Sequence, residues 1–209
     1  MKYYPVFLNV LGKKAVIIGG GKVSERKALA LIKAGACVTV VSPDLSEQLK
    51  QLKEKKLIHH ISRLYQKKDI AKAFIVIAAT DSLEVNTRIS KDAGGLVNVV
   101  DVPPLCNFIA PSVIQRGPLT LAISTSGTSP ALAKTIRKEI ETLYGPEIGG
   151  FLKFLSIIRR KALAHIPDRK EREKFLKRLA SDKMLQTLRS KGLQEIKKKV
   201  LQQLSSFTR

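Results

Sequence analysis

Short apolar runs alternate with amphipathic segments over the first hundred residues of the chain. Runs typical of buried strands occur at 15–18, 37–41, 57–61, 73–80 and 96–101. The segments between them have helical length and place apolar residues three and four positions apart, as at Ala28, Leu31 and Ile32. Strands separated by helices predict βαβ units, a parallel sheet and right-handed crossovers. The predicted fold class is therefore α/β.

The pattern changes after residue 104. Two short β-like runs come next, at 108–110 and 119–124. Ser129 and Pro130 then suit the N-cap and the first position of a helix. After residue 145 only helical patterns remain, at 147–165, 169–180, 182–190 and 193–206. We therefore expect an α/β domain followed by a helical C-terminal part.

Composition supports a globular protein with an unusual charge. The chain has 209 residues, of which 44% are hydrophobic, enough for one substantial core and a smaller appendage. Lys and Arg number 38 against 17 Asp and Glu, which gives a net charge of +21. Such a field favours polyanionic partners, namely nucleic acid, an anionic membrane or an acidic small molecule. A lysine-rich, well-solvated surface explains the charge equally well.

Several classes of protein do not fit the sequence. No run of about 18 apolar residues predicts a membrane span. The N-terminal segment is too broken by Pro5 and Asn9 for a secretory signal. Cys37 and Cys106 lack metal-ligand spacing, and the three histidines form no cluster with them. We expect a cytoplasmic protein with reduced thiols, no membrane association and no metal site.

The segment after the first strand has the composition of a dinucleotide-binding turn. Gly19 and Gly21 fill the first two positions of the G-x-G-x-x-G pattern, and Ser24 replaces the third. The first glycine allows the tight turn, the second lets the backbone approach a pyrophosphate, and the third position packs helix against strand. A small serine suits that packing, and a helix N-terminus presents N–H groups to phosphate. The flanking strands and helix favour a cofactor site over a purely structural turn.

The ends of the strands indicate which cofactor this is. Asp44 comes slightly later than the acidic residue that binds the adenine ribose in this fold. It either reaches the ribose hydroxyls or caps the following helix. No arginine stands nearby to hold a 2′-phosphate, so NAD is predicted rather than NADP. Thr80, Asp81 and Asn98 lie at strand ends that face the expected cofactor.

Five motifs occur in an order that resembles one enzyme family. They are GGGKVSERK, AATDSLEVN, NVVDVP, FIAPSVI and STSGTSP. Together they resemble the precorrin-2 dehydrogenases, which include the N-terminal part of bacterial sirohaem synthase and free-standing dehydrogenases. The similarity is strong over about residues 1–145 and weak in the helical tail.

This resemblance implies an organisation and a reaction. The implied regions are a Rossmann NAD-binding domain (1–112), a dimerisation region (113–145) and a helical C-terminal domain (146–209) in a homodimer. The implied reaction is NAD-dependent oxidation of precorrin-2 to sirohydrochlorin. Some members also insert Fe²⁺ to give sirohaem, which leaves chelation open here. These tetrapyrroles are rich in carboxylates, which gives the positive charge a specific candidate partner.

The resemblance also assigns roles to residues. Asp101 closes the NVVD motif and matches the essential aspartate of the family. It would act as a general base for the protons that remain after hydride loss, whereas alone it would be interpreted as an exposed turn residue. Lys22 and Val23 match NAD contacts of the family, as do Pro43 and Asp44.

A loop of small residues is the predicted substrate region. It comprises Ser124, Thr125, Ser126 and Gly127, ahead of a helix. The loop either serves only to cap that helix or binds anions such as substrate carboxylates. In the family it borders the tetrapyrrole pocket, although some relatives have serine at the position of Thr125. Asn107 is predicted on the substrate side as well.

Two other functions remain open. An NAD-sensing regulator that binds nucleic acid would fit a basic helical tail on a Rossmann domain. The tail has no helix-turn-helix or RNA-binding motif and aromatic residues are scarce, so nucleic acid is not the expected partner. A non-catalytic module that binds tetrapyrroles is the other alternative, and Asp101 and the glycine turn argue against it.

Overall fold

The computed structural model describes residues 3–207, which divide into two compact units. The first unit ends at Ala110 and the second begins at Pro111. The finer division into three regions expected from the sequence stays a prediction. Within residues 3–207, no helix is long and apolar enough to cross a bilayer.

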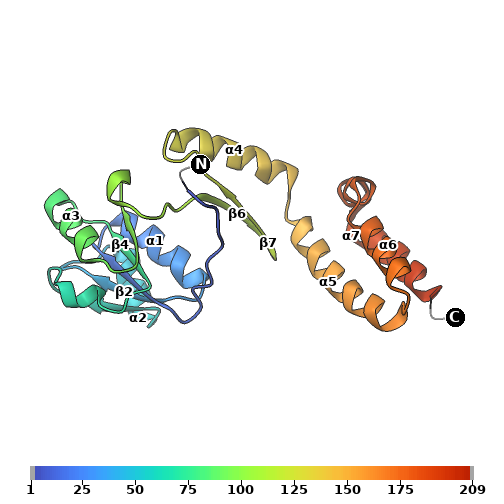
Figure 1. Ribbon diagram of the computed structural model, residues 1–209, viewed down its shortest axis with the longest axis horizontal. Helices are drawn as coiled ribbons and strands as arrows, with labels where there is room; N and C mark the ends of the chain where they lie inside the picture. Colours follow the sequence, from blue (N-terminus) through green and yellow to red (C-terminus); the bar gives the residue numbers. More distant parts are fainter. Residues whose placement is uncertain (1–2, 208–209) are drawn as a thin grey trace. The chain divides into compact units, whose positions relative to one another are not determined.

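The first unit is built around a five-stranded parallel sheet with the order β3-β2-β1-β4-β5 (Figure 1). Its strands are β1 (Lys14–Ile18), β2 (Cys37–Val41), β3 (Ile58–Ile61), β4 (Ile75–Ala78) and β5 (Leu96–Val99). Each strand coincides with one of the apolar runs in the sequence. The predicted α/β class and the parallel sheet are therefore confirmed.

Helices cover both faces of this sheet. They are α1 (Lys22–Lys33), α2 (Glu47–Glu54), α3 (Leu83–Asp92) and the short 3₁₀ helices η1 (Lys67–Ile70) and η2 (Pro103–Leu105). Successive strand residues point to opposite faces, so β1 sends Ile17 into one core and Ile18 into the other. Helices α1 and α2 pack on the first core, and α3 and η1 pack on the second. Burial on both faces explains why the strands are continuous apolar runs.

The order of the strands defines where a ligand can bind. β2 and β3 lie on one side of β1, whereas β4 and β5 lie on the other. The order reverses between β1 and β4, and ligands of open α/β sheets bind at the carboxyl ends of such strands. The backbone N–H of Ala79 donates to Ile18 O at 2.8 Å, so the two strands stay joined up to this edge.

The second unit contains a β-hairpin and four helices. Its elements are β6 (Ser112–Arg116), β7 (Leu119–Ile123), α4 (Pro130–Leu143), α5 (Glu147–His165), α6 (Arg169–Leu179) and α7 (Asp182–Ser205). The last three helices share one hydrophobic core. Gly192 has a φ of 77° and interrupts α7, which agrees with the two helices predicted there. Ser129 caps α4 and Pro130 begins it, as predicted.

The predicted strand at 108–110 is wrong. Phe108 packs against the core beneath α1 and α2, and its carbonyl accepts a hydrogen bond from Asn98 Nδ2 at 3.1 Å. Phe108 therefore serves the core of the first unit rather than a strand. The strand begins later, at Ser112, which pairs with Ile123.

The alternative in which Asp44 caps the second helix is also wrong. Helix α2 begins after Ser46, whose side chain accepts a hydrogen bond from the backbone N–H of Leu49 at 3.4 Å. The carbonyl of Asp44 instead accepts a hydrogen bond from Ser42 Oγ at 2.6 Å within the preceding loop. The carboxylate of Asp44 is thus free of a capping role.

Candidate functional site

The first glycine of the turn is required by a close approach of two strand ends. Gly19 has a φ of +120°, a conformation that favours glycine. A Cβ atom at Gly19 would collide with the carbonyl oxygen of Ala79, immediately after β4. The tight turn therefore sits at the reversal between β1 and β4, where the sequence predicted a cofactor site.

Gly20 has a structural role that the sequence analysis did not assign. A Cβ atom there would collide with the carbonyl oxygen of Asp44 in the loop after β2. The carbonyl of Gly20 also accepts a hydrogen bond from the Ser46 N–H at 2.8 Å. The G-x-G pattern requires glycine only at Gly19 and Gly21. A third glycine between them was therefore the one sequence signal that Gly20 has a role of its own.

Gly21 is different because the space beside it is open. No atom lies within 4 Å of the position that its Cβ would occupy. Gly21 is the N-cap of α1, and no side chain among the described residues caps that helix. Ser46 and Ser82, by contrast, cap α2 and α3 with their side chains. The first N–H groups of α1 are therefore available to a phosphate, which fits the pyrophosphate of a dinucleotide.

Ser24 fits the packing position of the third glycine. It is fully buried, and its Oγ lies 3.2 Å from the position that a Cβ of Gly19 would take. Among the described residues Oγ has no hydrogen-bond partner, so the side chain serves packing rather than polarity. A small residue at this position keeps α1 close to β1.

The predicted adenosine side of the site is exposed at the end of β2. Pro43 and Asp44 border a pocket of about 460 Å³. Its other lining residues are Leu45, Lys50, Lys53, Glu54 and His60. The ring of His60 bonds through Nε2 to the carbonyl of Ser42 at 2.9 Å, which ties β3 to this loop. Asp44 lies where a carboxylate can reach ribose hydroxyls, and that contact stays a prediction.

The loop after β4 is held by a pair of side chains. Thr80 Oγ1 donates to Asn86 Oδ1 at 2.8 Å, and Asn86 Nδ2 donates to the carbonyl of Thr80 at 2.9 Å. Asp81 follows and is exposed. Thr80 and Asp81 thus border the same sheet edge as the glycine turn, next to Ala79.

Asp101 lies in a turn that begins at the end of β5. The Val100 N–H donates to Ala78 O at 2.9 Å, which holds the start of the turn against the end of β4. The Val102 N–H closes the turn on Val99 O at 3.3 Å. Asp101 is exposed and has a φ of 59°, a left-handed conformation that aspartate, asparagine and glycine tolerate best. The carboxylate is therefore presented at the carboxyl edge of the sheet, as predicted for a catalytic residue.

Cys106 holds the Asp101 turn in place. Its Sγ accepts a hydrogen bond from the Val99 N–H at 3.1 Å. The thiol lies 3.2 Å from Val99 O and 3.4 Å from Val102 O, so it can donate to either carbonyl. These contacts bracket Asp101 from both sides. Nothing in the sequence indicated this role, because a lone cysteine has no pattern.

Asn98 and Asn107 also organise the segment after β5. The buried Asn98 donates through Nδ2 to Phe108 O at 3.1 Å. Asn107 accepts the Val97 N–H at 2.8 Å and donates to Gly95 O at 2.8 Å. Both side chains therefore fold the chain back along β5. Their contacts with cofactor or substrate stay predictions.

The predicted substrate loop belongs to the second unit and folds on itself. Ser124 Oγ accepts the Ser126 N–H at 3.0 Å, and Thr125 Oγ1 accepts the Ser129 N–H at 3.1 Å. Gly127 has a φ of +86°. Each hydroxyl serves as an acceptor in these bonds and keeps its own hydrogen for an anion.

The two units thus divide the predicted site residues. Asp101, Asn107 and all the predicted cofactor residues lie in the first unit, whereas residues 124–127 lie in the second. Over residues 3–207, no group of three or more His, Cys, Asp and Glu side chains is placed to hold a metal ion.

Comparisons with known proteins agree with this geometry. A family model described as "Putative NAD(P)-binding" matches residues 6–112, and one described as "Sirohaem biosynthesis protein central" matches residues 116–143. A solved structure of SirC, a precorrin-2 dehydrogenase, superposes with a TM-score of 0.83 at 25% identity, covering 98% of this chain and 100% of that one.

Full-length relatives extend the similarity. The sirohaem synthase of Thioalkalivibrio sulfidiphilus is 40% identical over 182 residues, which is 86% of this chain and 37% of that protein. The sirohaem synthase of a Psychrobacter species is 34% identical over 207 residues, 98% of this chain and 42% of that protein. The chain therefore spans less than half the length of these relatives. The matches confirm the resemblance carried by the five motifs.

The open face of Gly21 gives a test of the cofactor site. Gly21→Asp should weaken NAD binding by about 10²-fold, because a carboxylate would stand where the pyrophosphate approaches. The melting temperature should not fall, since the substituted side chain meets open space and aspartate is a good N-cap. Isothermal titration calorimetry and thermal unfolding measure the two effects. Gly20→Ala is the contrasting variant, and it should lower the melting temperature by pressing on Asp44. Unchanged NAD affinity in Gly21→Asp would place the cofactor elsewhere.

Proposed function

We propose that this chain, which belongs to the NAD(P)-binding family whose model matches residues 6–112, is an NAD-dependent precorrin-2 dehydrogenase. The observation that carries this proposal is the uncapped N-terminus of α1 at the strand reversal, with the open face of Gly21 beside it. Asp101 stands at the carboxyl edge of the same sheet. The similarity to SirC over both whole chains supports precorrin-2 as the substrate.

The chemistry needs one hydride acceptor and one proton acceptor. Oxidation of precorrin-2 to sirohydrochlorin removes one hydride and one proton. Bound NAD supplies the hydride acceptor. Asp101 takes the proton as general base, because its carboxylate is exposed and held in a fixed turn. The N–H groups of the first turn of α1 and the backbone of Gly21 hold the pyrophosphate.

The positive charge suits such a substrate. A net charge of +21 raises the encounter rate with an acidic tetrapyrrole. In the second unit, the hydroxyls of Ser124 and Thr125 are donors for its carboxylates. Both features support a binding role for the predicted substrate loop.

The activity is tested by anaerobic incubation of the purified chain with precorrin-2, with and without NAD. Sirohydrochlorin, followed by its absorbance, should form only when NAD is present. Fe²⁺ is then added to the same reaction, and a further shift to the sirohaem spectrum would add chelation as a second activity. Absence of sirohydrochlorin in the presence of NAD would reject the dehydrogenase.

We expect a preference for NAD over NADP. The Asp44 carboxylate lies at the end of β2 and repels a 2′-phosphate, and kcat/KM should favour NAD by about tenfold or more. Asp44→Asn should lower the ratio of kcat/KM with NAD to kcat/KM with NADP, because it removes the negative charge and keeps the shape of the side chain. Steady-state kinetics with both cofactors measure the ratio. A higher kcat/KM with NADP in the unchanged chain would refute the preference.

We also propose a homodimer formed through the region from about 105 to 145. The β6–β7 sheet has only two strands, so each strand leaves one edge unpaired within residues 3–207, and such edges need cover. Val113, Leu132 and Leu143 are apolar and about half exposed. Light scattering at micromolar concentration should give twice the 23.1 kDa of one chain.

A pair of variants locates the dimer contact. Leu132→Glu should shift the mass toward that of one chain, because a charge would be buried in the contact. Leu201→Glu, at an exposed apolar position on α7, should not. A monomer mass for the unchanged chain would eliminate the dimer.

Asp101→Asn tests the catalytic carboxylate. Asparagine tolerates the left-handed turn and keeps the shape, but it cannot accept a proton as a base. Oxidation of precorrin-2 should fall by about 10²-fold or more, with NAD affinity and melting temperature unchanged. Stopped-assay kinetics and calorimetry measure these quantities. Oxidation at the unchanged rate would mean that another group takes the proton, and loss of NAD binding alone would make Asp101 a cofactor residue.

A further inference from the structure

Lys27 lies in the middle of α1, on the face of the sheet where Val100 and Phe108 also pack. It is half-buried and stands four residues before Leu31. Residues four apart share one face of a helix, so the two side chains project from the same side. Leu31 packs against the same buried cluster as Val100 and Phe108, which flank Asp101 in the sequence.

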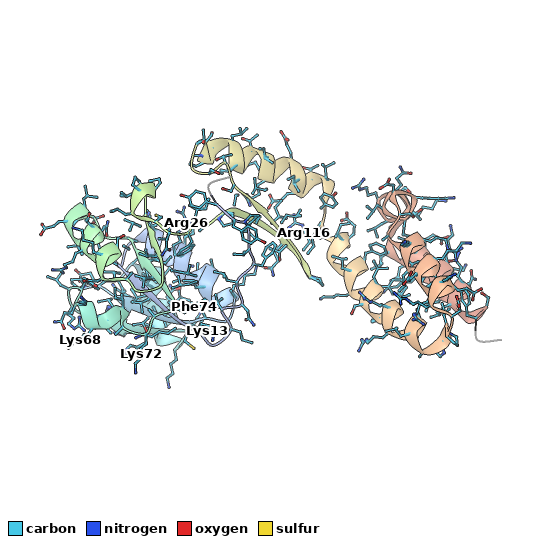
Figure 2. All side chains as sticks on the ribbon, in the orientation of Figure 1. Lys13, Arg26, Lys68, Lys72, Phe74 and Arg116 are labelled. Atoms are coloured by element: carbon cyan, nitrogen blue, oxygen red, sulfur yellow. The ribbon has the colours of Figure 1, made fainter. Side chains whose placement is uncertain are left out.

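The ammonium group of Lys27 has no hydrogen bond or ion pair within residues 3–207. Burial lowers the pKa of Lys27, and Arg26 beside it lowers the pKa further. Cys106 and Asp101 act in the opposite direction through Coulomb attraction. Arg26, labelled in Figure 2, is itself exposed on α1. Asp101 is therefore close enough to influence the pKa of Lys27, but it forms no ion pair with the ammonium group.

We propose that Lys27 binds a carboxylate of the substrate next to Asp101. The proposal rests on the proposed function, which makes the substrate an acidic tetrapyrrole. A half-buried charge without a partner is costly, and a substrate carboxylate supplies the missing partner in a partly desolvated place. The contact holds the macrocycle against the Asp101 carboxylate, which takes the proton.

The position of Lys27 favours the substrate over the cofactor as its ligand. The pyrophosphate site uses the N-terminus of α1, which begins at Lys22. Lys27 lies more than one helical turn further along. Lys27 is instead within electrostatic reach of Asp101, the proposed catalytic residue to which the substrate must come.

Kinetics of matched variants test this role. Lys27→Gln should raise KM for precorrin-2 by about tenfold or more, the usual effect of losing a hydrogen bond to a charged group. It should leave NAD affinity unchanged and should not lower the melting temperature, because the lost charge had no partner. Lys27→Arg should retain most of the affinity. Lys33→Gln is the control, since it removes the same charge from the exposed end of the same helix.

Binding of the product provides a readout that does not depend on turnover. Titration with sirohydrochlorin, followed by quenching of its fluorescence, should show the same loss of affinity in Lys27→Gln and not in Lys33→Gln. Affinity should be greatest at pH values below the lowered pKa of Lys27 and should fall as the pH rises through it, because the ammonium loses its charge. Lys27→Arg should remove this fall, since arginine stays charged.

The outcomes separate the two proposals. If the unchanged chain does not oxidise precorrin-2, the proposed function fails. If it does, but Lys27→Gln matches Lys33→Gln in both KM and sirohydrochlorin affinity, the role of Lys27 is overturned. A loss of NAD affinity in Lys27→Gln, with substrate affinity unchanged, would also overturn it.

Discussion

Two backbone contacts at the turn after β1 set the geometry of the whole site. Gly19 and Gly20 let the chain pass against the carbonyls of Ala79 and Asp44, where any side chain would collide. These contacts bring the loops after β2 and β4 to the N-terminus of α1. With Gly21 facing open space, the uncapped helix end is left open to a phosphate, and both loops border it. The proposed cofactor site therefore depends on all three glycines, each for a different reason. Gly19 allows the contact with Ala79, Gly20 allows the contact with Asp44, and Gly21 leaves the helix end open.

The segment after β5 carries Asp101, the proposed general base. Side-chain contacts of Cys106 and of two asparagines fold it back along the edge strand. Asp101 is thereby held in a left-handed turn with its side chain exposed, which is what our proposed general base requires. In our proposal helix α1 connects the two functions, because its first turn would hold the pyrophosphate and Lys27, within electrostatic reach of Asp101, would hold the substrate. A single helix can therefore place cofactor and substrate with respect to each other.

The sequence predicted most of the fold because parallel strands buried on both faces are continuous apolar runs. The sequence-based predictions were wrong where contacts between distant segments decide between two local structures. Asp44 and Ser46 are both residue types that cap helices well. The hydrogen bond from the Ser46 N–H to the carbonyl of Gly20 fixes Ser46 as the cap. Phe108 is apolar, as strand residues often are, but it packs against a core formed by residues that are distant in sequence. The contacts of Cys106 depend on a segment folded back along β5, so no local pattern could show them.

The most direct measurement is a crystal structure of the chain with NAD bound. The pyrophosphate should lie over Gly21, within hydrogen-bond distance of the N–H groups at the start of α1, and the adenosine should lie on the side of Asp44. Density for the dinucleotide at any other edge of the sheet, or a Gly21 face covered by protein, would contradict the cofactor site on which the proposed reaction depends.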